Sequence, residues 1–429
     1  MPPARSAYLH IPFCHRRCYY CDFAVVPLGD HAAAEPGAPG AASIAAYLEL
    51  LQREIAASPP GPPLSTVYLG GGTPSLLSPA QVAGLLQALK QRYGLAAGAE
   101  ISLELDPASF DERRLAGYLA AGVNRVSLGG QSFDDQVLAS LGRRHRCKDL
   151  QQAIRWLQQA HRQGSLSSWS LDLLQAVPAL PGQPAAPGRD DWRAQLQQAI
   201  ASAAPHLSVY ELTLEPGTVF GKRAERGELG LADDELAADL FDLTSTALSA
   251  AGYGHYEISN YALPGHASRH NRVYWSGADW WGFGLGATSC QGGRRLARPR
   301  TRAAYAAWLD DLEQQPAVSE AGPQAAAGLP LDERLLVGLR RREGVVMAAL
   351  LADAGLQPRS LPDHLEQLRQ LLAPERERGL LLIEGHRWRL SEPAGLALSN
   401  AVLRKLLDWW ERVGPPPTGS APPEPGHAD

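Results

Sequence analysis

Short apolar strands alternate with amphipathic helices along the first half of the chain. Runs of three to six residues rich in Val, Leu, Ile and Tyr are each followed by a segment with apolar residues at helical spacing. The expected strands are Tyr8–Ile11, Thr66–Leu69, Ile101–Leu105, Val126–Leu128, Trp169–Leu174 and Leu207–Leu212. The expected helices are Ser43–Ile55, Pro79–Tyr93, Asp111–Ala121, Asp134–Leu141, Asp149–Gln163 and Asp191–Ala203. Repeated β/α units predict a parallel sheet with helices outside it, either a partial barrel or a doubly wound sheet.

The regular alternation fades after about Pro216. A helix over Asp233–Ala250 precedes an aromatic and glycine-rich stretch, and Gln314–Gly328 has the composition of a linker. Beyond it we expect helices and a small hairpin, as in a winged-helix-like module with a structural or docking role. The pattern therefore predicts an α/β core over residues 1–255 and an aromatic extension over 256–313. A helical C-terminal domain over 329–413 and a disordered Pro-rich tail over 414–429 complete the chain.

Composition and charge exclude several classes of protein. The chain has 429 residues, of which 45% are hydrophobic and 20% charged, and this is typical of a globular protein with more than one domain. The net charge of -5 argues against a nucleic-acid-binding surface. No apolar run reaches the ~20 residues of a membrane span, and Met1–Ser6 does not resemble a secretion signal. We expect a cytoplasmic protein with reduced cysteines.

Three of the five cysteines lie in one short loop after the first strand. Cys14, Cys18 and Cys21 form a C-x3-C-x2-C pattern, which lets three sulfurs converge on one object. A 4Fe-4S cluster held by three thiolates would keep one iron open for a ligand. Two alternatives remain open from the cysteines alone. The pair Cys18 and Cys21 could be a redox couple, or the three thiols could bind zinc together with a histidine. The candidate zinc histidines are His10, His15 and His31.

Polar and glycine residues recur where the expected strands end. Chemistry collects at the carboxyl ends of parallel strands, so we expect these side chains to share one site. The glycines of Gly70–Pro74 let a ligand approach the backbone, although alone they are equally typical of a tight turn. A carboxylate inside a central strand is costly to bury without a partner. The candidates are Glu104 and Asp106 at the end of the third strand, Gln131 at the end of the fourth unit, Arg143 twelve residues later, and Asp172 inside the fifth strand.

Ordered motifs over most of the chain closely resemble the coproporphyrinogen-oxidase-like radical SAM family. The matching segments are Tyr-Leu-His-Ile-Pro-Phe-Cys, Gly-Gly-Gly-Thr-Pro, Ser-Leu-Gly-Gly-Gln-Ser-Phe, Leu-Gly-Arg-x-His, Ser-Leu-Asp-Leu, Glu-Pro-Gly-Thr, Glu-Ile-Ser-Asn and His-Asn-x-x-Tyr-Trp. The resemblance implies a partial (β/α)6 TIM-like barrel, the radical SAM core, with a mostly helical, winged-helix-like C-terminal domain. It runs from about Ser6 to the last helix.

The resemblance also implies cofactors and the residues that hold them. Cys14, Cys18 and Cys21 would bind a 4Fe-4S cluster, and S-adenosylmethionine would chelate the open iron. An electron from the cluster would release a 5′-deoxyadenosyl radical, chemistry that the cofactor supplies. The residues implied around S-adenosylmethionine are Tyr8, Gly71, Gly72, Thr73, Glu104, Gln131, Arg143 and Asp172. Two segments depart from the family pattern: Asp106 replaces the usual Asn, and the segment 176–178 looks inserted before Pro181–Gln183.

Two branches of the family compete as models for this chain. Oxygen-independent coproporphyrinogen III oxidases carry a further cysteine two positions past the triplet, where this chain has Phe23, and a long arm before the cysteines. Only thirteen residues precede Cys14 here. The HemW-type heme chaperones resemble this chain at both places. We therefore expect a heme chaperone without coproporphyrinogen oxidase activity and assign no catalytic residue, with the oxidase as the alternative.

Resemblance to the chaperone branch implies heme and its partners. Heme would be passed to acceptor hemoproteins, including respiratory ones, with an electron donor for the cluster and contact with the membrane periphery. The implied heme residues are His270, Asn271, Tyr274 and Trp275. An imidazole can ligate iron and aromatic rings offer flat apolar surface. On residue types alone, a loop residue near packed rings is the better interpretation of His270, and His145, His255 and His266 are rival ligands. A zinc-stabilised scaffold is a third class.

Overall fold

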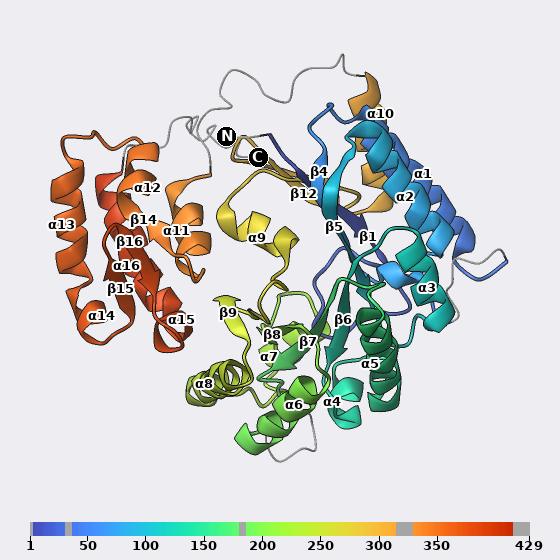
Figure 1. Cartoon of the computed structure of the whole chain (residues 1–429), viewed down its shortest axis with the longest axis horizontal. Coiled ribbons are helices and arrows are strands. Elements are labelled where there is room, and N and C mark those ends of the chain that lie inside the picture. The colour runs from blue at the N-terminus through green and yellow to red at the C-terminus, as the bar shows by residue number, and fades with distance from the viewer. Residues whose placement is uncertain (1–2, 31–36, 180–185, 315–328, 415–429) are drawn as a thin grey trace, which may run out of the picture. The chain divides into compact units, whose positions relative to one another are not determined.

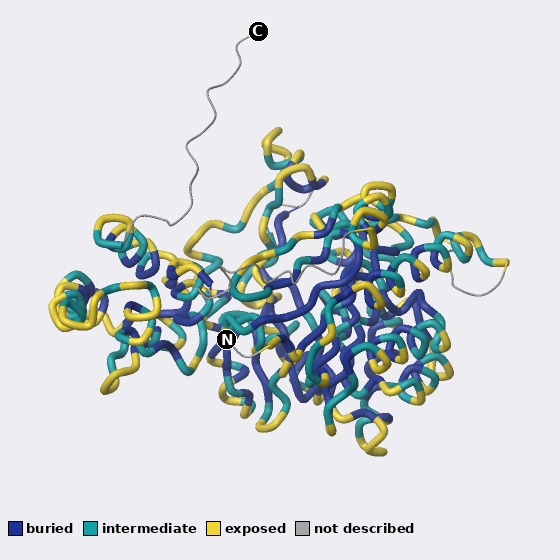
Figure 2. The backbone as a smooth tube through the Cα atoms, turned by 90° about the horizontal axis from the view of Figure 1, so that it is seen from above, coloured by how far each residue is buried: buried dark blue, intermediate teal, exposed yellow. Residues whose placement is uncertain are grey.

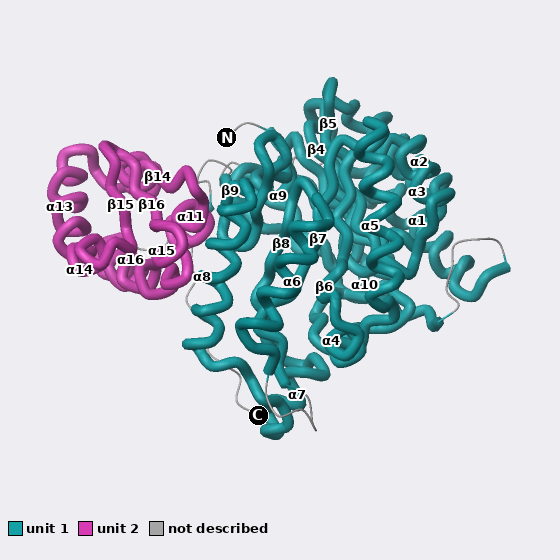
Figure 3. Tube along the Cα trace, turned by 60° about the horizontal axis from the view of Figure 1, so that its bottom comes forward, with its two compact units in different colours: residues 1–329 teal, residues 330–429 magenta. Residues whose placement is uncertain are grey.

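The computed structural model of the chain describes residues 3–30, 37–179, 186–314 and 329–414. The chain divides into two compact units, Met1–Leu329 and Pro330–Asp429, coloured separately in Figure 3. Four expectations fall outside the described residues: His31 as a candidate zinc ligand, the linker beyond Gln314, the segment Pro181–Gln183 and the disordered tail beyond Gly414.

The first unit is built on one nine-stranded sheet with the order β11-β1-β4-β5-β6-β7-β8-β10-β9. Six strands from β1 to β8 are parallel and lie side by side in chain order, β11 is parallel to β1, and β10 and β9 are antiparallel at the other edge. This order is that of a barrel, not of a doubly wound sheet. The partial barrel is thus confirmed. The strands are β1 Ser6–Ile11, β4 Leu64–Gly71, β5 Leu95–Leu105, β6 Arg125–Gln131, β7 Ser168–Gln175, β8 His206–Glu211, β9 Gly254–Glu257, β10 Asn260–Ala262 and β11 Trp281–Phe283.

Helices follow most of the parallel strands and cover the outer side of the sheet, as Figure 1 shows for α1 to α3 and α5. They are α1 Ala41–Ala57, α2 Pro79–Arg92, α3 Glu112–Ala120, α4 Asp135–Ser140, α5 Cys147–Arg162, α6 Arg189–Ala201, α7 Val219–Glu225, α8 Asp234–Ala250, α9 Arg269–Ser276 and α10 Arg302–Gln314. Ser78 caps α2 through a capping box with Gln81, as its position before Pro79 predicts. The prediction that Ser43 caps α1 is wrong, because the helix begins earlier and its N-cap is Gly40, with φ +89°.

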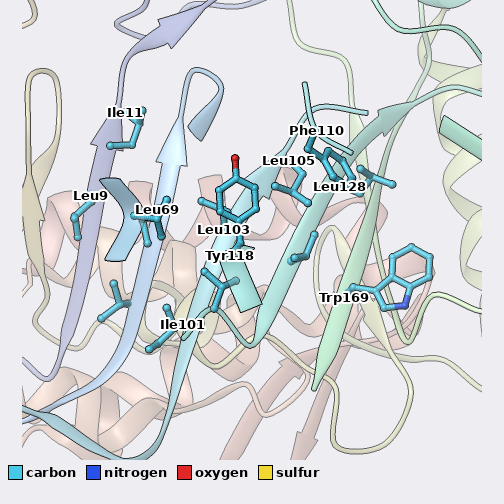
Figure 4. Close-up of a cluster of buried hydrophobic side chains, with 14 of the residues drawn as sticks. Leu9, Ile11, Leu69, Ile101, Leu103, Leu105, Phe110, Tyr118, Leu128 and Trp169 are labelled. Carbon is cyan, nitrogen blue, oxygen red and sulfur yellow. The ribbon is translucent and has the colours of Figure 1, made fainter. Parts of the chain in front are cut away.

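Each central strand places apolar side chains on one face of the sheet and polar ones on the other. Leu9, Leu69, Leu103 and Val126 are neighbours across four strands and belong to the main core with the helices (Figure 4). The alternate row contains Glu104, Ser127 and Ser170. Figure 2 shows the sheet as the most deeply buried part of the unit. The polar face of the sheet is therefore the inner face of the barrel.

The second unit is mostly helical and contains a three-stranded antiparallel sheet of order β14-β16-β15. The expected hairpin and last helix are both present, and the succession of helices and strands is that of a winged helix. Trp388 of β16 is buried in this unit. Its elements are α11 Leu331–Leu339, β14 Val345–Val346, α12 Met347–Asp353, α13 Leu361–Leu371, α14 Ala373–Glu377, β15 Leu381–Glu384, β16 Arg387–Leu390, α15 Ala394–Ala397 and α16 Ser399–Val413. Among the helices of the described residues, none has both the length and the apolar composition needed to cross a bilayer.

A buried carboxyl at the edge of the sheet makes stability depend on pH. Burial raises the pKa of Glu257 to about 7, while hydrogen bonds from Asn260 and the Ser259 N–H oppose the rise. The folded chain then binds this proton more tightly than the unfolded chain, so the stabilisation is present at low pH and is lost as pH rises through 7. As pH rises from 5 to 8, the free energy of unfolding of Glu257→Gln should therefore increase relative to that of wild type by on the order of 2 kcal/mol.

Urea unfolding midpoints of both proteins across this pH range measure the effect. Glu228→Gln, at an exposed side chain of the same unit, serves as the matched control. If the wild type and Glu257→Gln show parallel pH profiles, the buried carboxyl is not the cause.

Candidate functional site

All three loop cysteines line one cleft of about 390 Å³ on the polar face of the sheet. Cys14 lies in the short strand β2 (Phe13–Cys14), which pairs with β3 (Val26–Pro27) and so holds both ends of the loop. The Thr73 hydroxyl donates to the Cys14 Sγ over 3.5 Å, and Arg143 approaches the Cys18 Sγ to 3.8 Å. The three thiols are free and partly exposed, and burial raises the pKa of Cys14 to about 12.

The glycine turn packs directly against the backbone that leads into the cysteine loop. Gly71 has φ +116°, and a Cβ on Gly72 would lie 2.7 Å from the Phe13 carbonyl oxygen. The Gly72 and Thr73 N–H groups donate to the carbonyls of Ile11 and Phe13. The glycines therefore have a packing reason of their own, and they leave Thr73 in the cleft beside Cys14.

Glu104 lines the cleft and is held in place by two donors. The Tyr68 hydroxyl donates to its Oε1 over 2.9 Å, and the Gly71 N–H donates to its Oε2 over 3.0 Å. Burial raises the pKa of Glu104 to about 7 despite these bonds. No ion pair to Glu104 is present among the described residues, so a cation entering the cleft would find an uncompensated carboxyl group.

Arg143 is paired within the cleft with the residue that departs from the family pattern. Its Nη2 lies 2.7 Å from the Asp106 Oδ2 and also donates to the Gly129 carbonyl. Burial acts to raise the pKa of Asp106, but the charge of Arg143 and the contact with His145 outweigh it and keep the pKa low. The guanidinium of Arg143 is thus already neutralised by Asp106 before any ligand carboxylate arrives.

Asp172, inside β7, and Gln131, at the end of β6, complete the cleft wall. Asp172 accepts hydrogen bonds from Ser127 and Ser170 over 2.6 and 2.7 Å, and burial raises its pKa against these bonds. Gln131 has φ +62° next to a register shift between β6 and β7, a left-handed conformation that costs energy outside glycine. Both side chains line the cleft.

Tyr8 is the one residue expected around S-adenosylmethionine that is not among the cleft-lining side chains. Its hydroxyl lies 3.0 Å from the His10 Nδ1, and its ring is stacked against Tyr68 at a centroid distance of 6.2 Å. Tyr8 therefore contacts the site only through Tyr68, which bonds Glu104.

The expected heme residues lie in α9 and are not among the side chains that line this cleft. Glu100 accepts hydrogen bonds from the first N–H groups of the helix, at Arg269 and His270. The His270 ring is buried, stacks on Tyr68 at 5.1 Å and lies within 2.8 Å of both the Thr66 hydroxyl and the Tyr274 hydroxyl. Burial lowers the pKa of His270 to about 3, so the ring is neutral.

The other members of this motif also have internal partners. The Asn271 N–H donates to the capping hydroxyl of Ser268, and Tyr274 packs edge-on against Trp280 at 4.8 Å. Trp275 is half-buried. With both ring nitrogens of His270 engaged, iron ligation there requires the bond to Thr66 or the bond to Tyr274 to break.

Sequence reasoning missed several residues that line the cleft. Tyr68, Ser127 and Tyr210 come from strand interiors, and the exposed Arg16 and Arg17 from the cysteine loop. Two of them could have been found from the sequence, because Tyr68 and Ser127 occupy the alternate strand positions that face away from the apolar core.

The residues present fit a cluster and S-adenosylmethionine by their chemistry. The three thiols share one cleft with the buried Glu104 carboxyl group, the Asp172 carboxylate and the Arg143 guanidinium. Glu104 has no cationic partner among the described residues. Within the described part of the chain, no three His, Cys, Asp or Glu side chains are arranged around a single-ion position. The fit therefore rests on the shared cleft and the donor types.

Comparisons with known proteins give the family. Residues 8–169 match the model of the radical SAM superfamily. The chain is 39% identical over 420 residues to "Heme chaperone HemW" of Synechocystis sp., covering 95% of this chain and 97% of the relative. The HemW of Mycobacterium tuberculosis is 36% identical over 405 residues, covering 94% of each chain.

Among solved structures, coproporphyrinogen III oxidase (HemN) from Escherichia coli shares the fold. The TM-score is 0.71 at 21% identity, and the match covers 94% of this chain and 90% of that one. Long alignments well above 30% identity define membership more sharply than the fold does. The chain belongs to the HemW family of the radical SAM superfamily.

Proposed function

We propose that this chain binds heme and transfers it to acceptor hemoproteins, with a 4Fe-4S cluster and S-adenosylmethionine bound in the cleft. Similarity over nearly the whole chain to proteins named heme chaperones carries the proposal. The composition of the cleft supports the two cofactors, and the thiols, carboxyl groups and guanidinium each have a role.

Cys14, Cys18 and Cys21 hold the cluster, which supplies single electrons when bound. Glu104 and the backbone of Gly71 to Thr73 bind the amino group of S-adenosylmethionine. The positive charge of this group compensates the charge of the buried Glu104 carboxylate. Arg143 meets the ligand carboxylate and shares its charge with Asp106. Asp172, already oriented by two serines, accepts from the ribose hydroxyls, and Gln131 contacts the ligand beside it.

An oxygen-independent coproporphyrinogen III oxidase is the second candidate, since HemN shares the fold. Phe23 stands at the position of the further cysteine of the oxidases and lines the cleft with 54% of its surface exposed. An apolar ring there supplies neither a thiolate nor a proton, which favours the chaperone.

The same proposal covers location and partners. Five free cysteines fit the reducing cytoplasm. The partners are heme, acceptor hemoproteins such as respiratory ones at the membrane periphery, and an electron donor for the cluster.

One paired assay on the anaerobically reconstituted chain tests the function. Heme is titrated by absorbance, and coproporphyrinogen III is incubated with S-adenosylmethionine and a reductant. We expect saturable heme binding near one equivalent, transfer to an apo-hemoprotein, and no decarboxylation. Conversion to protoporphyrinogen without heme binding would instead identify an oxidase.

A further inference from the structure

Two exposed aromatic rings line the cleft, one from the cysteine loop and one from β8. Phe23 and Tyr210 are 54% and 39% exposed, and both line the cleft. They are two of only six large apolar side chains that are exposed in the described residues. Exposed aromatic surface gathered at one cleft marks a binding site, and flat rings suit a planar apolar ligand.

Positive charge lies beside these rings. Arg16 and Arg17 are exposed, line the same cleft and donate only to backbone carbonyls, those of Arg143 at 3.2 Å and Cys21 at 3.4 Å. Neither has a carboxylate partner among the described residues, whereas the neighbouring Arg144 is paired with Asp30. Two uncompensated guanidinium groups in a chain of net charge -5 favour an anionic ligand with two acidic groups.

An available imidazole lies in the same loop. The His15 Nδ1 is 3.1 Å from the Gly29 carbonyl oxygen, which makes Nδ1 the donor and leaves Nε2 as a lone-pair nitrogen. No partner for Nε2 is present in the part of the chain that the structure describes, and His15 lines the cleft. This arrangement is typical of a histidine that ligates iron, and it differs from His270, whose two ring nitrogens are both engaged.

We propose that heme docks on the cleft rim, which we define as His15, Arg16, Arg17, Phe23 and Tyr210. The two propionates meet Arg16 and Arg17, the porphyrin face lies on Phe23 and Tyr210, and His15 supplies the iron ligand. The proposal rests on the heme-binding function proposed above and locates it. The helix α9, with His270, is then a packing element of the barrel.

Heme titration of the reconstituted full chain tests the site. Arg16→Gln/Arg17→Gln should weaken heme binding by about tenfold or more, because two charge-assisted contacts are lost. Its matched control is Arg376→Gln/Arg378→Gln, which removes two exposed arginines of the second unit and should leave the affinity unchanged. Iron and sulfide contents must be equal in all three proteins.

A second arm uses the unaltered protein, so it does not depend on how a variant folds. Heme dimethyl ester, whose propionates carry no charge, should bind wild type about tenfold more weakly than heme. The arginine double variant should bind the two ligands alike.

The iron ligand has a separate readout. His15→Ala should shift the Soret band of bound heme, whereas His270→Phe should preserve it.

The outcomes distinguish a failure of this heme site from a failure of the proposed heme-binding function. If wild type binds no heme, the proposed function fails. If wild type binds heme and ester equally, and His270→Phe abolishes the complex while the arginine double variant does not, heme is bound at α9 and the cleft rim is wrong.

Discussion

Replacing Cys14 with alanine is expected to abolish the intact cluster. Two thiols cannot hold a cubane that three bind at different corners, and Cys14 is anchored in β2 beside Thr73, so no other cysteine of the described chain can replace it. Iron and acid-labile sulfide, measured after anaerobic reconstitution, should fall to a small fraction of the wild-type content.

The control for this variant is Cys147→Ala, which removes a half-buried thiol of α5 outside the cleft and should retain full iron and sulfide. A Cys14→Ala protein with wild-type iron, sulfide and cluster absorbance would show that the loop does not bind the cluster in this way.

Glu54→Ala should strongly destabilise the first unit. The Glu54 carboxylate is buried, lies 2.7 Å from the Arg298 Nε, and also accepts from Tyr305 and the Gly284 N–H. Removing it leaves the buried Arg298 charge unpaired, at a cost of about 3–5 kcal/mol in the free energy of unfolding. Urea unfolding of the variant should show a correspondingly lower midpoint.

The neighbouring residue offers a matched control. Arg53, the neighbour of Glu54 in α1, pairs with Asp310 and Glu313 of α10 at the surface. Surface pairs contribute little, so Arg53→Ala should leave the midpoint close to wild type. The double variant Glu54→Leu/Arg298→Met should recover part of the loss, because it buries no lone charge. Equal midpoints for Glu54→Ala and Arg53→Ala would contradict this account.

The alternation of strands and helices predicted a parallel sheet with helices outside it, because each β/α unit has its own apolar period, and the family resemblance implied that this sheet forms a partial barrel. Glu104 near the end of β5 and Asp172 inside β7 could be placed in one site, since chemistry collects toward the carboxyl ends of parallel strands. Sequence position could not show the partner of each side chain. Asp106 pairs with Arg143, and Tyr8 stacks on Tyr68. Both pairings depend on the register between strands, which sequence position does not give.

The helix α9 shows where sequence patterns fail. Its eight residues carry polar and aromatic side chains without a clear apolar stripe, so no periodicity indicated a helix. Contacts remote in sequence stabilise it: Glu100 binds its first N–H groups, and Thr66 and Tyr68 surround His270. Of the four motif residues only His270 is fully buried, whereas Asn271, Tyr274 and Trp275 are half-buried.

The pairing of Arg143 with Asp106 makes the cleft electrically polarised along its depth. Deep in the cleft, one guanidinium is cancelled by its own carboxylate, so the carboxyl groups of Glu104 and Asp172 determine the sign there. At the opening, Arg16 and Arg17 carry the opposite sign without compensation among the described residues. Such a gradient attracts a sulfonium into the cleft and retains a dianion at its entrance. Charge therefore directs the two ligands to different depths of the cleft, in addition to any effect of shape. It also favours the sulfonium over the demethylated thioether, which keeps its amino group but lacks the positive charge on sulfur that the deep carboxyl groups attract.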